Sequence, residues 1–100
     1  MNVGIIGSGG REHAICFMLK KSKKVSKIFC FPGNAGTESI AQNISLDPDN
    51  FYELEKHCIE NQIKLLVVGP EKPLVNGVVD FFKGQPIKVC GPDTISSNLE

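Results

Sequence analysis

The residues best suited to bind a ligand form a glycine-rich segment near the start of the chain, Gly7-Ser8-Gly9-Gly10-Arg11-Glu12. Glycines leave backbone N–H groups unobstructed, and the N-terminus of a following helix adds partial positive charge. A phosphate placed there would meet several donors, and Arg11 could add a charge-assisted hydrogen bond. We therefore expect Gly9, Gly10 and Arg11 to contact an anion. The alternative is that these glycines only form a turn between a strand and a helix.

This segment matches the dinucleotide-binding fingerprint only in part. G-x-G is present at Gly7 and Gly9, but Glu12 stands at the third glycine position. The second apolar run ends in Pro32-Gly33-Asn34 and offers no acidic residue to bind a ribose. A P-loop is excluded because no G-K-[ST] follows the glycines. These departures disfavour a dinucleotide-dependent oxidoreductase domain, which we keep as an alternative.

Two later segments also follow apolar runs and carry polar side chains. Pro32-Gly33-Asn34-Ala35-Gly36-Thr37 combines a proline, two glycines and two polar residues, which suits either a simple turn or a binding loop. Gly69-Pro70-Glu71-Lys72-Pro73-Leu74 follows the most apolar run. The Glu71 carboxylate could accept two hydrogen bonds from a vicinal diol such as that of a ribose. Its alternatives are a solvated charge or a helix cap.

The two histidines and the lysine-rich stretch are weaker candidates. His13 lies near the start of the first expected helix, where its side chain could pack against residues 32–37, and we favour a structural role for it. We expect His57 to be solvated in the middle of a helix. The lysines between residues 20 and 27 suit a helix end, where cations interact well with the dipole. Eleven basic residues balance eleven acidic ones, so nucleic-acid and membrane binding are disfavoured.

These segments must be positioned by a small α/β domain. Apolar, β-branched runs at residues 3–6, 27–31, 65–68 and 87–90 predict four strands. Helical patterns separate them, which predicts a Rossmann-like parallel sheet of about four strands in three layers, with helices on both faces. We prefer the strand order second, first, third, fourth. The loops at 7–11, 32–37 and 69–74 would then leave the same edge, at the topological switch where ligands bind.

The helical segments have distinct apolar stripes and ends. Residues 11–21 predict a helix that buries Ala14, Ile15, Met18 and Leu19. Asp47-Pro48 resembles an N-cap for a second helix, with Phe51, Leu54 and Cys58 on its inner face. Pro73 opens a third helix, which Gly84 ends, and Ser96 is expected to cap a further helix. The buried side of the third helix would be formed by Leu74, Val75, Val78, Val79 and Phe82.

Composition limits the class of protein. One hundred residues, 41% of them hydrophobic, predict a single domain over 1–100. The four cysteines, Cys16, Cys30, Cys58 and Cys90, show neither zinc-site nor redox-pair spacing and are expected to act as small hydrophobes. No signal peptide is recognisable, and no apolar run approaches the ~18 residues of a membrane span. We expect a reduced, cytoplasmic protein.

Taken together, the three segments resemble the amino-terminal domain of the phosphoribosylamine–glycine ligase family. The similarity rests on residues 7–14, 32–37 and 68–80, in that order and spacing, and Gly91-Pro92 fits the exit of the fourth strand. It covers the whole chain. The only notable departure in the loops is Ser8, where the family commonly has Asn.

The resemblance implies part of an ATP-grasp ligase of de novo purine synthesis, and for this chain the fold of a pre-ATP-grasp domain. Such a ligase phosphorylates glycine with ATP and Mg²⁺ (or Mn²⁺), and the amine of phosphoribosylamine attacks the glycyl phosphate. ATP and metal would be bound by later domains absent here, so the chain alone should be inactive, without catalytic or metal-binding residues. Its expected partners are phosphoribosylamine and those later domains.

The resemblance also suggests which residues face the substrate. Gly9, Gly10 and Arg11 would contact the phosphate and Glu71 the ribose, while the remaining residues form the pocket wall: Asn34, Ala35, Gly36, Thr37, Gly69 and Pro70. Two alternatives stay open besides the oxidoreductase. One is a free-standing sugar-phosphate or nucleotide-binding module, and the other is a related ligase that uses a different substrate.

Overall fold

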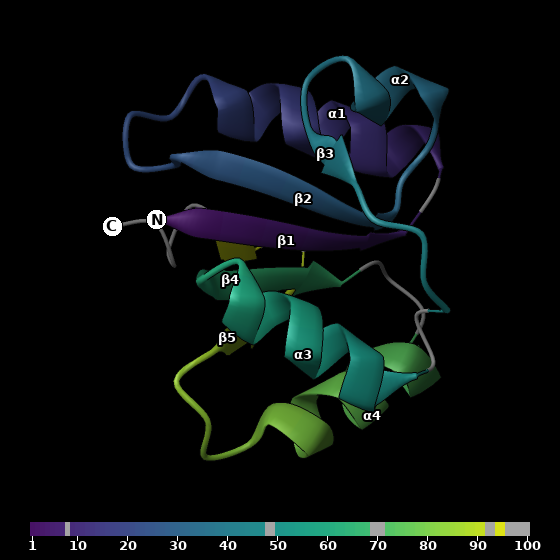
Figure 1. The fold of residues 1–100 in the computed structure, drawn as a ribbon, viewed down its shortest axis with the longest axis vertical. Helices are drawn as coiled ribbons and strands as arrows, with labels where there is room; N and C mark the ends of the chain where they lie inside the picture. Colours follow the sequence, from purple (N-terminus) through teal and green to yellow (C-terminus); the bar gives the residue numbers. More distant parts are fainter. Residues whose placement is uncertain (8, 48–49, 69–71, 92–93, 96–100) are drawn as a thin grey trace.

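The fold is one parallel sheet covered by helices on both faces (Figure 1). The computed structural model describes residues 1–7, 9–47, 50–68, 72–91 and 94–95, with the side chains of 72–76 excepted. Within this part the strand order is β3-β2-β1-β4-β5, all neighbours being parallel. The strands are β1 (Asn2–Gly7), β2 (Lys27–Pro32), β3 (Gln42–Asn43), β4 (Ile63–Val68) and β5 (Lys88–Cys90). The expected order of the four apolar strands is therefore confirmed.

The edge strand β3 was not expected. It consists of two polar residues that pair with Phe29 and Cys30 of β2. A two-residue polar segment has no apolar alternation, so no periodic signal marks it as a strand. Its pairing also fixes Asn43 beside the end of β2, where the Asn43 side chain takes part in the loop network described below.

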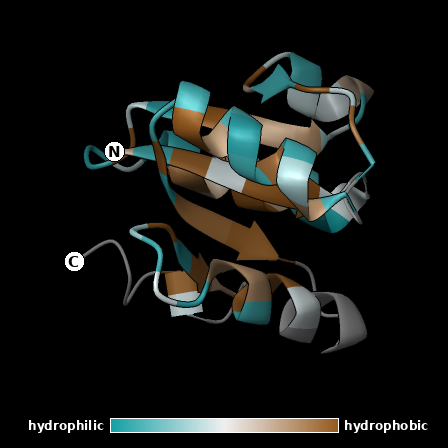
Figure 2. Ribbon diagram, turned by 60° about the horizontal axis from the view of Figure 1, so that its bottom comes forward, coloured by the Kyte–Doolittle hydropathy of each residue, from teal (hydrophilic) through white to brown (hydrophobic). Residues whose placement is uncertain are grey.

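In the described part of the chain, three longer helices cover the sheet: α1 (Gly10–Lys20) on one face, α3 (Phe51–Glu60) and α4 (Lys72–Phe82) on the other (Figure 1). Strand side chains alternate between two cores, as a sheet buried on both faces requires. Figure 2 shows brown along the strands and a mixture of brown and teal on the helices. The α1-side core contains Val3, Ile5, Ile15, Leu19, Leu65 and Val67, and the other contains Ile6, Phe31, Leu54, Leu66, Val78 and Phe82.

The buried faces of the helices differ partly from expectation. In α1 the side chains of Ile15, Cys16 and Leu19 are buried, whereas Ala14 and Met18 are exposed. The inner stripe is therefore rotated toward Cys16, whose side chain is buried in the α1-side core. In α4 the expected Val78 and Phe82 are buried, but Val79 is 42% exposed. Leu74 and Val75 fall outside the described side chains.

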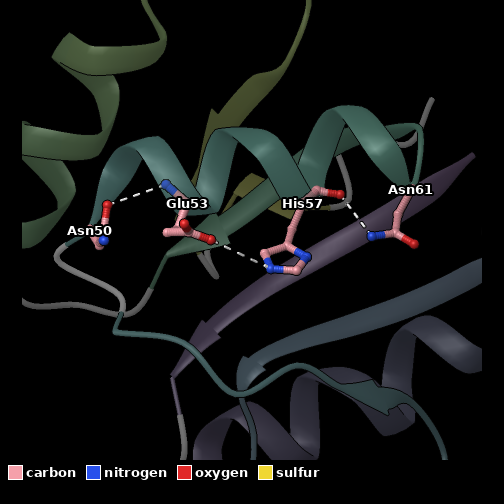
Figure 3. Close-up of polar contacts among 4 residues, drawn as sticks. All are labelled: Asn50, Glu53, His57 and Asn61. Atoms are coloured by element: carbon pink, nitrogen blue, oxygen red, sulfur yellow. Dashed lines mark hydrogen bonds and ion pairs between the residues drawn. The ribbon is translucent and has the colours of Figure 1, made fainter.

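Helix α3 begins later than predicted (Figure 3). Its N-cap is Asn50, whose side-chain oxygen accepts from the Glu53 N–H at 3.2 Å, so the predicted cap at Asp47 is wrong. Asn has the same capping ability as Asp, and it stands nearest to the apolar stripe. His57 lies 3.9 Å from the Glu53 carboxylate and 6.4 Å from the Phe31 ring, so it is partly buried instead of solvated. Asn61 donates to the His57 carbonyl at 2.8 Å and ends the helix.

The end of α4 follows the prediction, because Gly84 adopts φ +83° just beyond it, a value that favours glycine. The helix expected from Ser96 lies outside the described residues. None of the described helices has the length and apolar character needed to cross a membrane.

Candidate functional site: a rim at the carboxyl ends of β1 and β2

The first loop (residues 7–11) and the second loop (residues 32–37) lie side by side at one edge of the sheet. Gly7 and Pro32 are paired in register at the ends of β1 and β2. Beyond that pair, the Gly33 N–H donates to the Gly7 carbonyl at 3.0 Å. The expected meeting of these two loops is therefore confirmed, and we call their combined surface the rim.

The third loop (residues 69–74) is only partly described. Gly69, Pro70 and Glu71 lie outside the described residues, so their expected roles are not placed. The strand before them is described: Val68, the last residue of β4, pairs with Ile6 of β1. The third loop therefore begins at the same edge as the rim, one strand away.

Within the first loop, a carboxylate occupies a position expected to bind an anion. Glu12 Oε2 accepts a hydrogen bond from the Gly9 N–H at 3.0 Å. A Cβ at Gly7, which has φ +142°, would lie 2.3 Å from Glu12 Oε1. Glycine is required at this position both for its backbone conformation and for the space that Glu12 fills. A phosphate can use the Gly9 N–H only by displacing the Glu12 side chain.

Within the described part of the chain, the backbone N–H groups of Gly10 and Arg11 have no hydrogen-bond acceptor. Both residues are exposed, and a Cβ at Gly10 would meet no atom within 4 Å. They form the first turn of α1, where backbone N–H groups have no acceptor within the helix. The guanidinium of Arg11 belongs to the same turn. Gly10 and Arg11 thus provide the part of the rim best able to meet an anion, with Glu12 as a nearby opposing charge.

The second loop is more ordered than expected, because it contains a short helix, α2 (Ala35–Glu38). Asn34 caps this helix: its side-chain oxygen accepts from the Thr37 N–H at 2.9 Å. The Thr37 hydroxyl accepts from the Asn34 N–H at 2.8 Å and contacts Asn43 Oδ1 at 2.7 Å. Asn43 in turn donates to the Asn34 carbonyl at 2.8 Å.

This network changes the role of Thr37. Its side chain is fully buried and its hydroxyl is engaged within the protein. A side chain in that position shapes the second loop and presents no surface to a ligand. Asn34 and Gly36 are partly exposed and Ala35 is exposed, so these residues remain available on the rim.

Side chains also tie the two loops together. Asn34 Nδ2 donates to the Gly9 carbonyl at 3.0 Å, so one side chain caps α2 and reaches across to the first loop. His13 of α1 lies against the second loop, since a Cβ at Gly36 would be 3.1 Å from His13 Nδ1. The expected packing of His13 against residues 32–37 is confirmed. The rim is therefore one structure and not two independent turns.

Two contributors to the rim were not identified from the sequence. Glu12 stands three residues after Gly9, the spacing at which a Glu side chain returns to the cap position of a helix, and this signal could have assigned it. Asn43 carries no such signal, because its role depends on the pairing of β3 with β2.

A separate cleft lies at the opposite end of these strands. Its volume is about 490 Å³, and it is lined by residues 25–29, by residues 38–42 and by Lys20. They come from the end of α1, from the start of β2 with the two residues before it, and from the segment that runs from the end of α2 to the start of β3. None of the residues expected to bind substrate lines this cleft, so its size does not make it the candidate site.

Comparisons with known proteins agree with this fold. The family model "Phosphoribosylglycinamide synthetase, N domain" matches residues 1–100. The phosphoribosylamine–glycine ligase of Caldanaerobacter subterraneus is 40% identical over 100 residues, covering 100% of this chain and 24% of that protein. The enzyme of the same name from Rhodopirellula baltica is 44% identical over 99 residues, covering 99% of this chain and 23% of that protein.

A solved structure supports the same assignment. The crystal structure of phosphoribosylamine–glycine ligase from Thermotoga maritima superposes with a TM-score of 0.51 at 29% identity, covering 72% of this chain and 16% of that one. The chain spans about a quarter of the length of the curated relatives it matches. On this evidence, the chain belongs to the phosphoribosylglycinamide synthetase N-domain family.

Proposed function

We propose that this chain is the amino-terminal domain of a phosphoribosylamine–glycine ligase and that residues 1–100 form one substrate-side domain of it. Relatives that carry this name match the chain along its whole length. The intact enzyme would join glycine to phosphoribosylamine in purine synthesis. The amine of phosphoribosylamine would attack the carbonyl carbon of glycyl phosphate, and phosphate would leave as the amide forms.

The role of this domain would be to hold phosphoribosylamine on the rim. The observation that carries this proposal is the bond from Asn34 Nδ2 to the Gly9 carbonyl at 3.0 Å, which fixes the second loop against the first. A rim fixed before the ligand arrives loses less conformational freedom on binding. Ala35 and Gly36, which follow Asn34 in the chain, would form the wall of the substrate pocket.

The phosphate group would be bound by Gly10 and Arg11. Their N–H groups stand at the start of α1, and the Arg11 guanidinium can supply a charge-assisted hydrogen bond. Gly9 lies directly before these two residues in the first loop. Its N–H would donate to the phosphate only when the Glu12 side chain moves aside. The buried Thr37 would act as a positioning residue for the second loop.

The ribose would be bound by Glu71, with Gly69 and Pro70 beside it. We base this assignment of Glu71 on the sequence and on the position of the end of β4, where Val68 pairs with Ile6 of β1. The Glu71→Gln variant of the intact protein tests it. The substitution should raise the apparent KM for phosphoribosylamine more than the KM for ATP, because a carboxylate accepts two hydrogen bonds from a diol where an amide oxygen accepts fewer. Equal changes in both constants would remove Glu71 from the ribose site.

ATP and Mg²⁺ would be held elsewhere in the intact enzyme. Among the described residues, no three His, Cys, Asp or Glu side chains are grouped to hold a metal ion. The sequence also lacks a P-loop. We propose that the main partners of this chain are phosphoribosylamine and the other domains of the enzyme.

The cysteines bear on where the intact enzyme works. All four, Cys16, Cys30, Cys58 and Cys90, are free and buried. Free thiols are typical of a reducing compartment, which supports a cytoplasmic location.

The activity itself is tested on the intact protein by following ADP release. The proposal expects ADP release that requires both phosphoribosylamine and glycine, with glycinamide ribonucleotide as the product. Release that proceeds with another amine acceptor, and not with phosphoribosylamine, would contradict it.

A further inference from the structure

Two cysteines that are distant in the sequence meet inside the α1-side core. Cys16 projects from α1 and Cys30 from β2, and their Sγ atoms lie 3.2 Å apart. Both residues are free thiols with 0% exposure. The spacing of the cysteines along the chain gave no indication of this pair, because the contact exists only once α1 packs on the sheet.

The pair is set apart from the other two cysteines. Cys58 belongs to the core on the opposite face of the sheet. Cys90 lies on β5, which is separated from β2 by β1 and β4, or roughly 14 Å at the usual strand spacing. A covalent S–S bond is about 2.05 Å long, so Cys16 and Cys30 need an approach of only about 1 Å to form one.

The protonation of the two thiols is unequal. Hydrogen bonding to Cys30 and burial raise the pKa of Cys16, whereas the hydrogen bond from Cys16 lowers the pKa of Cys30. Either sulfur could be the donor in this contact, and the two pKa directions correspond to donation from the Cys16 S–H to the Cys30 sulfur. Cys30 is therefore the sulfur with more thiolate character, and thiolates are the reactive form toward oxidants.

We propose that Cys16 and Cys30 form an oxidative modification site, at which a small peroxide converts the two thiols into a reversible disulfide. In the first step the Cys30 thiolate attacks one oxygen of hydrogen peroxide. The O–O bond breaks, Cys30 becomes a sulfenic acid, and the leaving hydroxide takes a proton to become water. In the second step the Cys16 sulfur attacks the Cys30 sulfur, loses its proton and displaces the hydroxyl group as a second water. Two thiols are oxidised and one peroxide is reduced.

The site's burial determines the kind of oxidant and the rate. A sulfur with no exposed surface is reached by a small molecule during local opening of the fold, and a bulky disulfide reagent would need a much larger opening. The resulting bond would link α1 to β2 below the two loops of the rim. This inference stands independently of the proposed function, because it requires only the fold.

Peptide mapping provides a direct test, since trypsin places each cysteine on a different peptide. Cys16 falls in 12–20, Cys30 in 28–56, Cys58 in 57–64 and Cys90 in the peptide that begins at residue 89. The intact protein is treated with hydrogen peroxide, unfolded, alkylated with iodoacetamide and digested without reductant. Peptides 12–20 and 28–56 should appear joined, with the mass of two hydrogen atoms lost, and should separate after treatment with dithiothreitol. The proposal would be overturned if Cys16 and Cys30 were both recovered as unoxidised, alkylated cysteines at a peroxide dose that oxidises Cys58.

Two variants sharpen the test. Cys16→Ser keeps the size of the side chain and removes the resolving thiol, so Cys30 should accumulate as sulfenic or sulfinic acid with no joined peptide. Cys58→Ser is the matched control from the other core, and it should form the joined peptide as readily as the unchanged protein. Joined peptides that include Cys58 or Cys90 in similar amounts would contradict a specific pair. If Cys16→Ser does not fold, the mapping of the unchanged protein still decides.

Discussion

The most informative substitution is at Asn34, because this side chain has two separable functions. Its oxygen caps α2 through the Thr37 N–H, and its nitrogen donates to the Gly9 carbonyl in the other loop. Loss of an N-cap costs about 1 kcal/mol, and loss of a hydrogen bond between partly exposed groups costs about 0.5–1 kcal/mol. Asn34→Ala removes both and should lower the free energy of unfolding by about 2 kcal/mol.

Asn34→Asp separates the two functions. An Asp side chain can still accept from the Thr37 N–H, but it cannot donate to the Gly9 carbonyl, and it places a carboxylate oxygen against that carbonyl. We expect it to retain the cap and to lose about 1 kcal/mol or more through the broken link.

The matched control is Asn50→Ala. Asn50 caps α3 by accepting from the Glu53 N–H at 3.2 Å (Figure 3), and within the described part of the chain no hydrogen bond joins its side chain to the rim. Urea denaturation of all variants gives the comparison. Asn50→Ala should cost about 1 kcal/mol, which is less than Asn34→Ala. Equal losses for the two alanine variants, together with no loss for Asn34→Asp, would refute the idea that Asn34 fastens the two loops.

Three further predictions concern the core, the first loop and high pH. A Cβ at Gly4 would lie 2.9 Å from both Leu66 Cδ2 and Phe31 Cε2, so Gly4→Ala should cost about 1–3 kcal/mol in urea denaturation. Glu12→Gln removes a negative charge beside the Gly9 N–H and should tighten binding of ribose 5-phosphate severalfold in a calorimetric titration; unchanged or weaker binding would place the phosphate away from the first loop. Burial raises the pKa of Cys58 from 9.0 to about 12, so its neutral thiol favours the folded state. The contribution of this thiol to the free energy of unfolding is complete below pH 9. It is lost as the pH rises toward 12, by up to about 1.4 kcal/mol per pH unit. Cys58→Ala should show a shallower loss of stability in this range, and an identical pH profile would contradict the shift.

Much of the fold could be predicted because its strands are apolar and β-branched. Runs such as 65–68 are buried on both faces of the sheet and therefore lack polar alternation, a pattern typical of parallel strands. The order of those strands was a preference among the parallel arrangements with right-handed crossovers, and the structure confirms it. The edge strand Gln42–Asn43 could not be predicted in this way, because its pairing depends on where β2 lies and not on its own residues.

The candidate site could be predicted to the level of its loops but not of its side chains. Glycines at the ends of β1 and β2 marked where the chain turns, and the structure places those turns together. The spacing of Gly9 and Glu12 carries a capping signal that the prediction did not use, and no signal in the sequence indicated that Thr37 points inward. The contact of Glu12 with Gly9 and the inward position of Thr37 both depend on short-range competition for hydrogen bonds, in which a side chain of the protein takes the partner that a ligand was expected to take.

The same limit explains the cysteine pair. Cys16 and Cys30 each looked like a small hydrophobe, and each is buried as expected. Their contact arises from the rotation of α1 that buries Cys16 and exposes Ala14 and Met18. The buried stripe of α1 that was predicted from residue spacing was wrong by about one residue position. That difference decides whether the sulfur of Cys16 contacts the sulfur of Cys30.

The central claim is that the rim formed by the first and second loops binds a phosphorylated pentose. Titration of the ¹⁵N-labelled protein with ribose 5-phosphate, followed by amide chemical shifts, tests it most directly. The account predicts that the largest shifts occur at Gly10 and Arg11, with the Asn34 side-chain amide and Gly36 also affected, and that NAD does not reproduce them. Shifts confined to the cleft near Lys20 and Lys27, or an equal response to NAD, would contradict it.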